Sequence, residues 1–122
     1  MLKLIVIIEL LFIATLGYSQ GQRKIKGEIR DEDRKPIPGL VVIQLGTKTG
    51  TVTDVDGKFE LTVSNDPMIY VRAGAIDLEI YLKYSQKEEF KKVTLKDWKK
   101  IKKENKRILN EWNRKLKKID KN

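Results

Sequence analysis

The fold is decided by one stretch in the middle of the chain, PIPGLVVIQLGTKTGTVTDVDGKFEL, which covers residues 36–61. The two prolines at its start have fixed φ angles and favour an extended entry into the run 40–45. This run is apolar on both faces, which is typical of a strand in the middle of a sheet. Turns at 46–50 and 54–57 enclose a very short strand, and the alternating strand 59–63 follows them. The stretch therefore predicts a series of short strands joined by tight turns.

The residues on either side of this stretch continue the period of two. Apolar and polar side chains alternate over residues 24–30 and again over 76–84, and another strand is expected to begin at Met68. A weaker strand candidate spans residues 89–95. Residues 20–95 are therefore predicted to form one antiparallel β-sandwich of about seven short strands.

The first residues of the sequence are typical of a secretory signal peptide. Lys3 supplies a positive charge, and residues 4–17 form an apolar run that is shorter than the ~20 residues of a membrane-spanning helix. Gly17 and Ser19 are the small residues expected before a cleavage site that follows Ser19. Residues 1–19 are therefore predicted to direct export; the alternative is a buried N-terminal strand or helix.

Charge is distributed unevenly along the chain. The whole sequence has 26 basic and 17 acidic residues and a net charge of +9. Residues 96–122 hold 12 of the basic and 4 of the acidic residues, so a near-neutral body is followed by a basic tail. The sequence contains no His and no Cys, which excludes Ser-His-Asp triads, Cys-His nucleophiles, His-ligated zinc and disulfides.

Several segments taken together resemble a known family. In chain order they are residues 27–29, 31–33, 36–42 and 45–61. They are similar to the carboxypeptidase-regulatory-like domain, in the version found at the N-terminus of TonB-dependent outer-membrane receptors of Bacteroidetes. The resemblance implies a transthyretin-like sandwich of about seven strands, a location in the cell envelope, and a binding or structural role. It does not imply peptidase activity, because a zinc peptidase needs His and Glu ligands and this chain has no His.

The turns of the central stretch supply one set of site candidates, which we interpret as structural. Asp54 and Asp56 superficially resemble the start of a calcium loop, but Thr62 and Val63 stand where its Glu ligand is required. The two carboxylates are expected to accept hydrogen bonds from nearby backbone amides, and no metal or cofactor is predicted. The set consists of Pro38, Gly39, Gly46, Gly50, Asp54, Asp56, Gly57 and Phe59.

Residues 96–122 are predicted to form an amphipathic helix that Asp97 can cap. At helical spacing the apolar residues fall on one stripe of about 100°, with Asn105 inside it. The stripe consists of Trp98, Ile101, Ile108, Leu109, Trp112, Leu116 and Ile119. The second set of site candidates is a helix surface for contact with a partner or an anionic surface. It consists of Trp98, Lys99, Lys102, Lys103, Lys106, Arg107, Trp112, Arg114, Lys115 and Lys118.

The sequence leaves open what the apolar stripe faces. The helix is expected either to pack on the sandwich or to extend from it with a solvated basic face. Self-association is a second reading, since residues 98–112 approximate a heptad repeat with Asn105 in its core. A third is docking on lipid headgroups or an acidic glycan, with Trp98 and Trp112 at the interface. Nucleic acid is not expected as the partner of an exported protein.

The leading hypothesis is a non-catalytic, exported binding or structural module that acts through protein or surface contacts. It is expected in the periplasm or in association with the outer membrane. One alternative is a peripheral membrane protein that docks through helix 96–122. The other is a hydrolase that works with carboxylates alone, because two nearby carboxylates are the minimum for glycoside cleavage.

Overall fold

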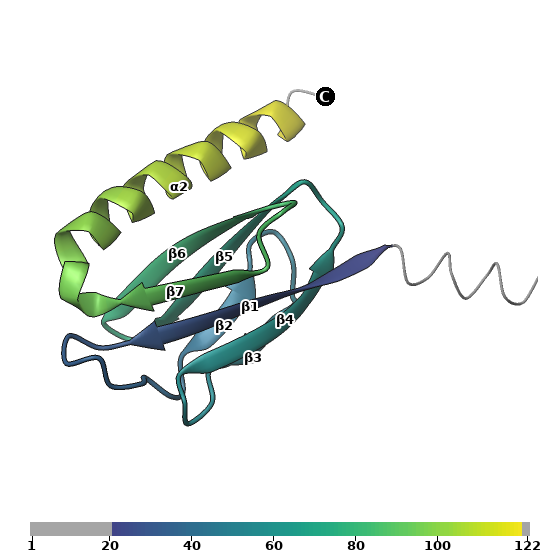
Figure 1. Ribbon diagram of the computed structural model, residues 1–122. Helices are drawn as coiled ribbons and strands as arrows, with labels where there is room; N and C mark the ends of the chain where they lie inside the picture. Colours follow the sequence, from purple (N-terminus) through teal and green to yellow (C-terminus); the bar gives the residue numbers. More distant parts are fainter. Residues whose placement is uncertain (1–20, 121–122) are drawn as a thin grey trace, which may run out of the picture.

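Figure 1 shows the computed structural model of the protein, which describes residues 21–120. The predicted signal peptide, residues 1–19, lies outside the described residues. The strands are β1 (Gln22–Arg30), β2 (Val41–Gln44), β3 (Gly50–Val52), β4 (Lys58–Ser64), β5 (Met68–Ala75), β6 (Leu78–Ser85) and β7 (Phe90–Thr94). A 3₁₀ turn, η1 (Leu95–Asp97), leads into the helix α2 (Trp98–Asp120).

The strands form two sheets that pack face to face, which confirms the predicted sandwich (Figure 1). One sheet has the order β4-β1-β7, and the other has the order β3-β2-β5-β6. The run that is apolar on both faces supplies β2, which lies between two neighbouring strands as this pattern predicts.

The core lies between the two sheets and is built from alternating residues of the strands. In β4, Phe59, Leu61 and Val63 are buried, while the residues between them are exposed. One continuous cluster joins the inward side chains: Ile25, Ile29, Leu40, Val42, Phe59, Leu61, Val63, Ile69, Val71, Ala73, Ile80, Leu82 and Tyr84. The alternation of side chains along each strand therefore determines which of them are buried in the core.

One strand pair departs from the predicted antiparallel arrangement. β7 runs parallel to β1, with Lys26 opposite Phe90 and Arg30 opposite Thr94. The cause is the route of the chain, because a short connection takes it from β6 in one sheet to β7 in the other. β6 ends beside the start of β1, where Arg23 Nη1 donates to the carbonyl oxygen of Ser85 at 2.9 Å. β7 therefore begins at the same end as β1 and runs in the same direction.

The connection between β3 and β4 is a tight turn held by one carboxylate. Oδ1 of Asp54 accepts hydrogen bonds from the backbone N–H groups of Asp56 and Lys58, each at 2.9 Å. Gly57 has a φ of 70°, and a Cβ atom there would lie 2.4 Å from the carbonyl oxygen of Ile29. Only glycine fits this conformation and this close approach to the end of β1.

The predicted C-terminal helix is confirmed, and it begins slightly later than expected. η1 occupies residues 95–97, so Asp97 is the residue immediately before the first α-helical residue. α2 lies across the sandwich on the side of β6 and β5 (Figure 1). None of the helices in the described part of the chain combines the length and the apolar character that a membrane span requires.

Candidate binding surface on the C-terminal helix

An aromatic cluster attaches α2 to the outer face of the sheet that contains β5 and β6. Tyr70 of β5 and Tyr81 of β6 are buried, and they pack against Ile108 of α2, which is only 4% exposed. The ring of Trp112 lies against Tyr70, with the two ring centroids 5.4 Å apart. Large aromatic surfaces are thereby removed from water on both elements, which holds the helix in place.

Asn105 binds the open edge of β6. Its Oδ1 accepts the backbone N–H of Tyr81 at 2.9 Å, and its Nδ2 donates to the carbonyl oxygen of Glu79 at 2.9 Å. β6 is the last strand of its sheet, so both backbone groups face away from β5. The side-chain amide takes the place of a peptide group from a neighbouring strand and covers part of an edge to which another chain can pair. In this structure the polar residue of the apolar stripe is therefore a contact with the sheet.

An ion pair lies beside the aromatic cluster. The carboxylate of Glu111 contacts Lys83 Nζ through both oxygens, at 2.8 and 3.1 Å. The hydroxyl group of Tyr70 donates to the same carboxylate at 3.3 Å. The hydrogen bond from Lys83 lowers the pKa of Glu111, whereas burial raises the pKa of Tyr70. At neutral pH Glu111 is therefore a charged acceptor that ties α2 to β5 and β6.

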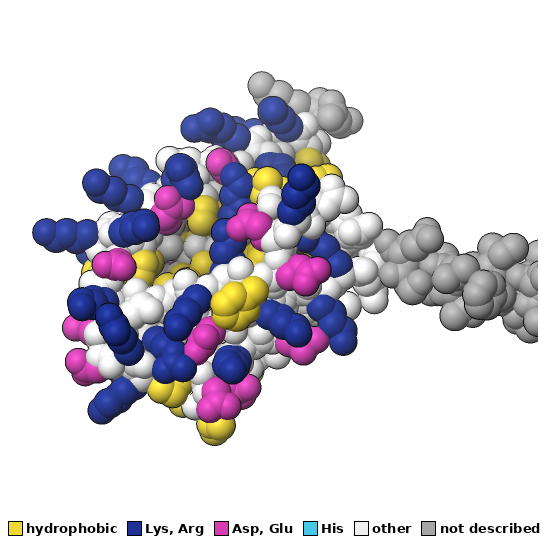
Figure 2. All heavy atoms as spheres, viewed as in Figure 1, with side chains coloured by type: hydrophobic (Ala, Val, Ile, Leu, Met, Phe, Trp, Pro, Cys, Tyr) yellow, Lys and Arg dark blue, Asp and Glu magenta, His cyan; other side chains and the backbone are white. Residues whose placement is uncertain are grey.

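The outward side of α2 is basic. All eight Lys and Arg residues of the predicted helix surface are exposed, and Figure 2 shows basic side chains along the helix. The two tryptophans of that surface are only half-exposed. Nζ of Lys102 lies 5.9 Å from the ring centroid of Trp98, and Nζ of Lys115 lies 5.9 Å from that of Trp112. The predicted set thus divides into exposed cations and aromatic residues that already have contacts within the chain.

The last turns of α2 are not buried against the sheet. Leu116 and Ile119 continue the apolar stripe, yet they are 40% and 61% exposed. Every residue from 113 to 119 is exposed. The helix therefore has a docked segment, residues 98–112, and an overhanging segment, residues 113–119, which the sheet does not cover.

A groove lies where the first turns of α2 cross the open side of the sandwich. Its volume is about 520 Å³, and its walls are β6, β7 and α2. Ile80 and Leu82 of β6 and Ile101 of α2 give it an apolar floor, and hydrophobic side chains are visible between the helix and the strands in Figure 2. The charged residues that line it are Lys83, Glu88, Lys91, Lys92, Asp97, Lys100, Glu104 and Arg107. Basic side chains are in excess, so the groove is cationic.

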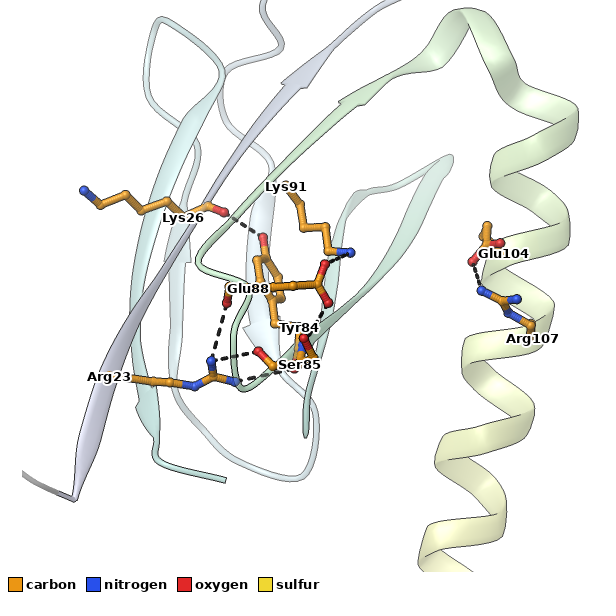
Figure 3. Close-up of polar contacts among 8 residues, drawn as sticks. All are labelled: Arg23, Lys26, Tyr84, Ser85, Glu88, Lys91, Glu104 and Arg107. Carbon is orange, nitrogen blue, oxygen red and sulfur yellow. Dashed lines mark hydrogen bonds and ion pairs between the residues drawn. The ribbon is translucent and has the colours of Figure 1, made fainter. Parts of the chain in front are cut away.

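Polar side chains hold the connection between β6 and β7, as Figure 3 shows. Oε1 of Glu88 accepts the N–H of Ser85 at 3.1 Å, and Oε2 pairs with Lys91 Nζ at 2.5 Å. The contact with Lys91 and the hydrogen bond from Ser85 lower the pKa of Glu88 to about 2. From β1, Arg23 donates to the carbonyl oxygens of Ser85 and Glu88. These contacts position β7, which forms one wall of the groove.

The predicted turn residues do not come together in one site. Gly39 lies near Asp54, because its N–H donates to the carbonyl oxygen of Thr53 at 3.0 Å. Gly46 lies at the opposite end of β2, and a Cβ atom on it would be 2.9 Å from Cη2 of Trp112. Gly46 is thus the turn residue that contacts the helix. Gly50 begins β3, and Phe59 of β4 lies in the core. The remaining members of the set lie in the loops and turns between strands.

Sequence reasoning did not select several polar residues that organise this region. Arg23 is one example, because its partner Ser85 lies 62 residues further along the chain. Thr53 is another: its hydroxyl group donates to the carbonyl oxygen of Ile37 at 2.8 Å and accepts the N–H of Leu40 at 2.9 Å. The only local signal for Thr53 is a hydrogen-bonding residue in a stretch that must bury its side chains.

Two relatives match this chain over a limited part of their length. It is 44% identical over 66 residues to TonB-dependent receptor P39 of Formosa agariphila and 35% identical over 68 residues to TonB-dependent receptor SusC of Bacteroides thetaiotaomicron. The matched segments cover 53% and 56% of this chain, but only 6% and 7% of the two receptors. The similarity therefore concerns one small part of much longer proteins.

A family model also matches the chain and extends further than the segments that carry the resemblance in the sequence. The model describes the CarboxypepD_reg-like domain and matches residues 25–111, which is well over half of the chain. The match begins in β1 and ends within α2 at Glu111, so it includes most of the docked segment. The protein belongs to the family of CarboxypepD_reg-like domains.

Proposed function

We propose that this protein is an exported, non-catalytic binding module of the cell envelope that holds an acidic protein partner on the outward side of α2. One observation carries the proposal: the docked segment uses its apolar side on the sandwich, while the basic residues all face water. Buried contacts hold the helix on the sandwich, so the backbone that carries the basic residues has a fixed position. A preformed cationic surface attracts an oppositely charged partner over a distance and fixes its orientation.

The family and the local chemistry support a module without catalysis. The sequence has no His and no Cys, and the relatives with known names are receptors. Two of the carboxylates that could serve a carboxylate-only hydrolase have other contacts. Asp54 accepts two backbone N–H groups, and Oδ1 of Asp31 accepts those of Asp33 and Lys35. Both carboxylates therefore act as turn acceptors.

Envelope location is supported by two independent features. Residues 1–19 have the pattern of a signal peptide, and both relatives are TonB-dependent receptors. An exported module that shares one domain with such receptors is expected to act in the same compartment.

Docking on a membrane surface is the second candidate, and the overhanging segment favours it. Leu116 and Ile119 are exposed among Arg114, Lys115 and Lys118, which is the arrangement of a short interfacial helix. Trp112 is not available for insertion into headgroups, because its ring packs on Tyr70. The membrane contact would therefore rest on charge and on two aliphatic side chains.

Site-specific photocrosslinking in intact cells tests the proposal. A photoreactive residue at position 99 of the full chain is expected to give a discrete protein adduct. The adduct is expected to be lost when Lys103→Glu and Lys106→Glu are combined, because reversing charges at the rim of an interface slows association. Lys35→Glu with Lys48→Glu is the matched control, since these exposed residues lie in loops of the sandwich.

Purified components separate the two candidates. The captured protein should bind the full chain with an affinity that falls as salt rises, and the helix variant should bind it at least about tenfold more weakly than the control. Vesicles that contain 30% phosphatidylglycerol serve as the membrane probe. Binding to vesicles that is lost in Leu116→Ser/Ile119→Ser, without a protein adduct, would replace the first candidate by the second. If neither a protein adduct nor vesicle binding is observed, both candidates are rejected.

A further inference from the structure

The open edge of β6 is accessible between two side-chain contacts. Asn105 binds the N–H of Tyr81, and Glu88 binds the N–H of Ser85. Backbone groups of alternate residues point to the same side of an antiparallel strand, so the N–H and C=O of Lys83 face this edge as well. At ~3.3 Å per residue, the edge from Tyr81 to Ser85 measures roughly 13 Å.

The neighbouring strand supports this direction for the backbone of Lys83. Tyr70 of β5 lies opposite Lys83, and its carbonyl oxygen accepts the N–H of Leu45 at 2.9 Å, on the side of β2. Tyr70 and Lys83 are therefore a non-hydrogen-bonded pair of the antiparallel ladder, in which the two residues direct their backbone groups away from each other. The N–H and C=O of Lys83 therefore point toward the groove.

The groove itself combines an apolar floor with a cationic rim. Ile80, Leu82 and Ile101 belong to the main core or pack against it, and they line the groove from below. Five basic and three acidic side chains surround them. Ion pairs hold several of these charged side chains: Glu88 pairs with Lys91, Glu104 with Arg107, and Lys83 with Glu111 of α2. The remaining charged lining residues are Lys92, Lys100 and Asp97, so basic charge is still in excess. An occupant with apolar groups facing the floor and negative charges facing the rim complements this surface.

We infer that this groove binds an extended peptide segment with alternating apolar and acidic side chains, which adds to the edge of β6. An extended chain supplies the backbone partners that Lys83 offers, and its side chains point alternately to opposite faces. One face meets Ile80 and Leu82, and the other meets Lys100 and the ion pair of Lys83 with Glu111. The volume of about 520 Å³ lies within the range of ligand clefts, ~300–1,000 Å³. Asn105, which already mimics a strand at Tyr81, marks one end of the binding edge.

This site is separate from the outward side of α2, so the peptide-binding inference and the proposed function can be tested independently. The proposed envelope partner contacts Lys103 and Lys106, which do not line the groove. The peptide site depends on the backbone of β6 and on Lys100. Variants in one place therefore leave the other unchanged.

Nuclear magnetic resonance of the ¹⁵N-labelled full chain tests the inference. The probe is a capped eight-residue peptide that alternates glutamate and valine, added up to millimolar concentration. Saturable shifts are expected at the amide of Lys83 and its neighbours in β6. Two N-methylated forms of the peptide are compared. In one form the methyl groups are on the amides that would face β6, and in the other they are on the alternate amides, which would face away. The form methylated on the β6-facing set should bind about tenfold more weakly, as expected for a lost backbone hydrogen bond.

Two protein variants locate the site. Lys83→Pro removes the edge N–H, which a strand tolerates at an outward position, together with the side chain that pairs with Glu111. Lys83→Ala removes that side chain alone and is the control, and Lys83→Pro should bind about tenfold more weakly than Lys83→Ala. Lys100→Glu should weaken it about threefold, with Lys48→Glu as the control of equal charge change. Equal binding by Lys83→Pro and Lys83→Ala, equal binding of the two methylated peptides, or no shift at millimolar peptide would each overturn the inference. If Lys83→Pro does not fold, the methylated peptides alone decide the result.

Discussion

The docked and overhanging segments of α2 have the same sequence pattern and different surroundings. In the docked segment Ile108 is buried and Asn105 binds β6, whereas Leu116 and Ile119 of the overhanging segment are exposed. Apolar residues recur at helical spacing in both. The difference teaches that a periodic pattern predicts which side of a helix is apolar, while contacts with the sheet decide how much of that side is buried.

The largest expected effect comes from removing an apolar side chain in each segment. Ile108→Ala should lower the free energy of unfolding by about 2–3 kcal/mol, because it leaves a cavity between Tyr70 and Tyr81. Ile119→Ala, the control in the overhanging segment, should change it by less than about 0.5 kcal/mol. Urea unfolding followed by circular dichroism measures both. Equal losses would mean that the two segments are not distinct.

A smaller loss of stability is expected when Asn105 of the docked segment is replaced by alanine. Asn105→Ala should cost about 1–2 kcal/mol, because it leaves the N–H of Tyr81 and the C=O of Glu79 without their side-chain partner. The exposed Asn113 is the matched control, and its replacement by Ala should have little effect. Hydrogen exchange at the amide of Tyr81 gives a second measurement, since it should accelerate in Asn105→Ala alone.

A comparison of two glycines with the same backbone conformation separates the effect of contact with Trp112 from the backbone cost of an alanine. Gly39 and Gly46 have φ values of 79° and 81°, so an alanine at either position carries a similar backbone cost of about 1–2 kcal/mol. A Cβ atom placed on Gly46 would meet the ring of Trp112, whereas one placed on Gly39 would have nothing within 4 Å. Gly46→Ala should therefore be more destabilising than Gly39→Ala by up to about 1 kcal/mol. The excess should vanish in a Trp112→Ala background, and its persistence there would remove Trp112 from the explanation.

The smallest effect is the pH dependence of the ion pair between Glu111 and Lys83. The pKa of Glu111 is lowered in the folded protein from its ordinary value of 4.5, chiefly by the hydrogen bond from Lys83. The pair therefore adds stability above pH 4.5, and this contribution is lost as the pH falls below that value. Because both side chains are about one-third exposed, we expect less than about 1 kcal/mol.

Glu111→Gln tests this expectation. It should be less stable than the original protein at pH 7, and the difference should shrink toward pH 3. Glu104→Gln is the control, because it removes an exposed pair within the helix and should cost less at pH 7. A difference for Glu111→Gln that stays constant from pH 7 to pH 3 would contradict the role given to its charge.

The strands could be predicted because each is a local pattern. Alternation in β4 predicts which residues enter the core, and the two-sided apolar run predicts that β2 is interior. In β6 the alternation correctly predicts that Ile80, Leu82 and Tyr84 are buried. It is wrong for Ile76, which lies in the turn before β6 and is fully exposed. The parallel pairing of β7 with β1 could not be predicted in this way. It depends on β6 ending beside the start of β1, a contact between Arg23 and Ser85 that no local pattern contains.

The candidate binding surface was only partly predictable for the same reason. Helical spacing alone predicts the outward position of Lys99, Lys103 and Lys106. The sequence also shows that Asn105 lies within the apolar stripe, but not that its amide binds a strand edge. The groove could not be anticipated, because its walls come from β6, β7 and α2 after the sheets are assembled.

The sequence by itself determined the sandwich strands, the tight turns, the basic amphipathic helix and the chemistry that this chain lacks, because each follows from residue type and short-range spacing. The tertiary structure decided which part of the apolar stripe is buried, what Asn105 binds and where a cationic groove opens. These features arise from contacts between residues far apart in the chain, and their geometry exists only when the two sheets and the helix have packed together.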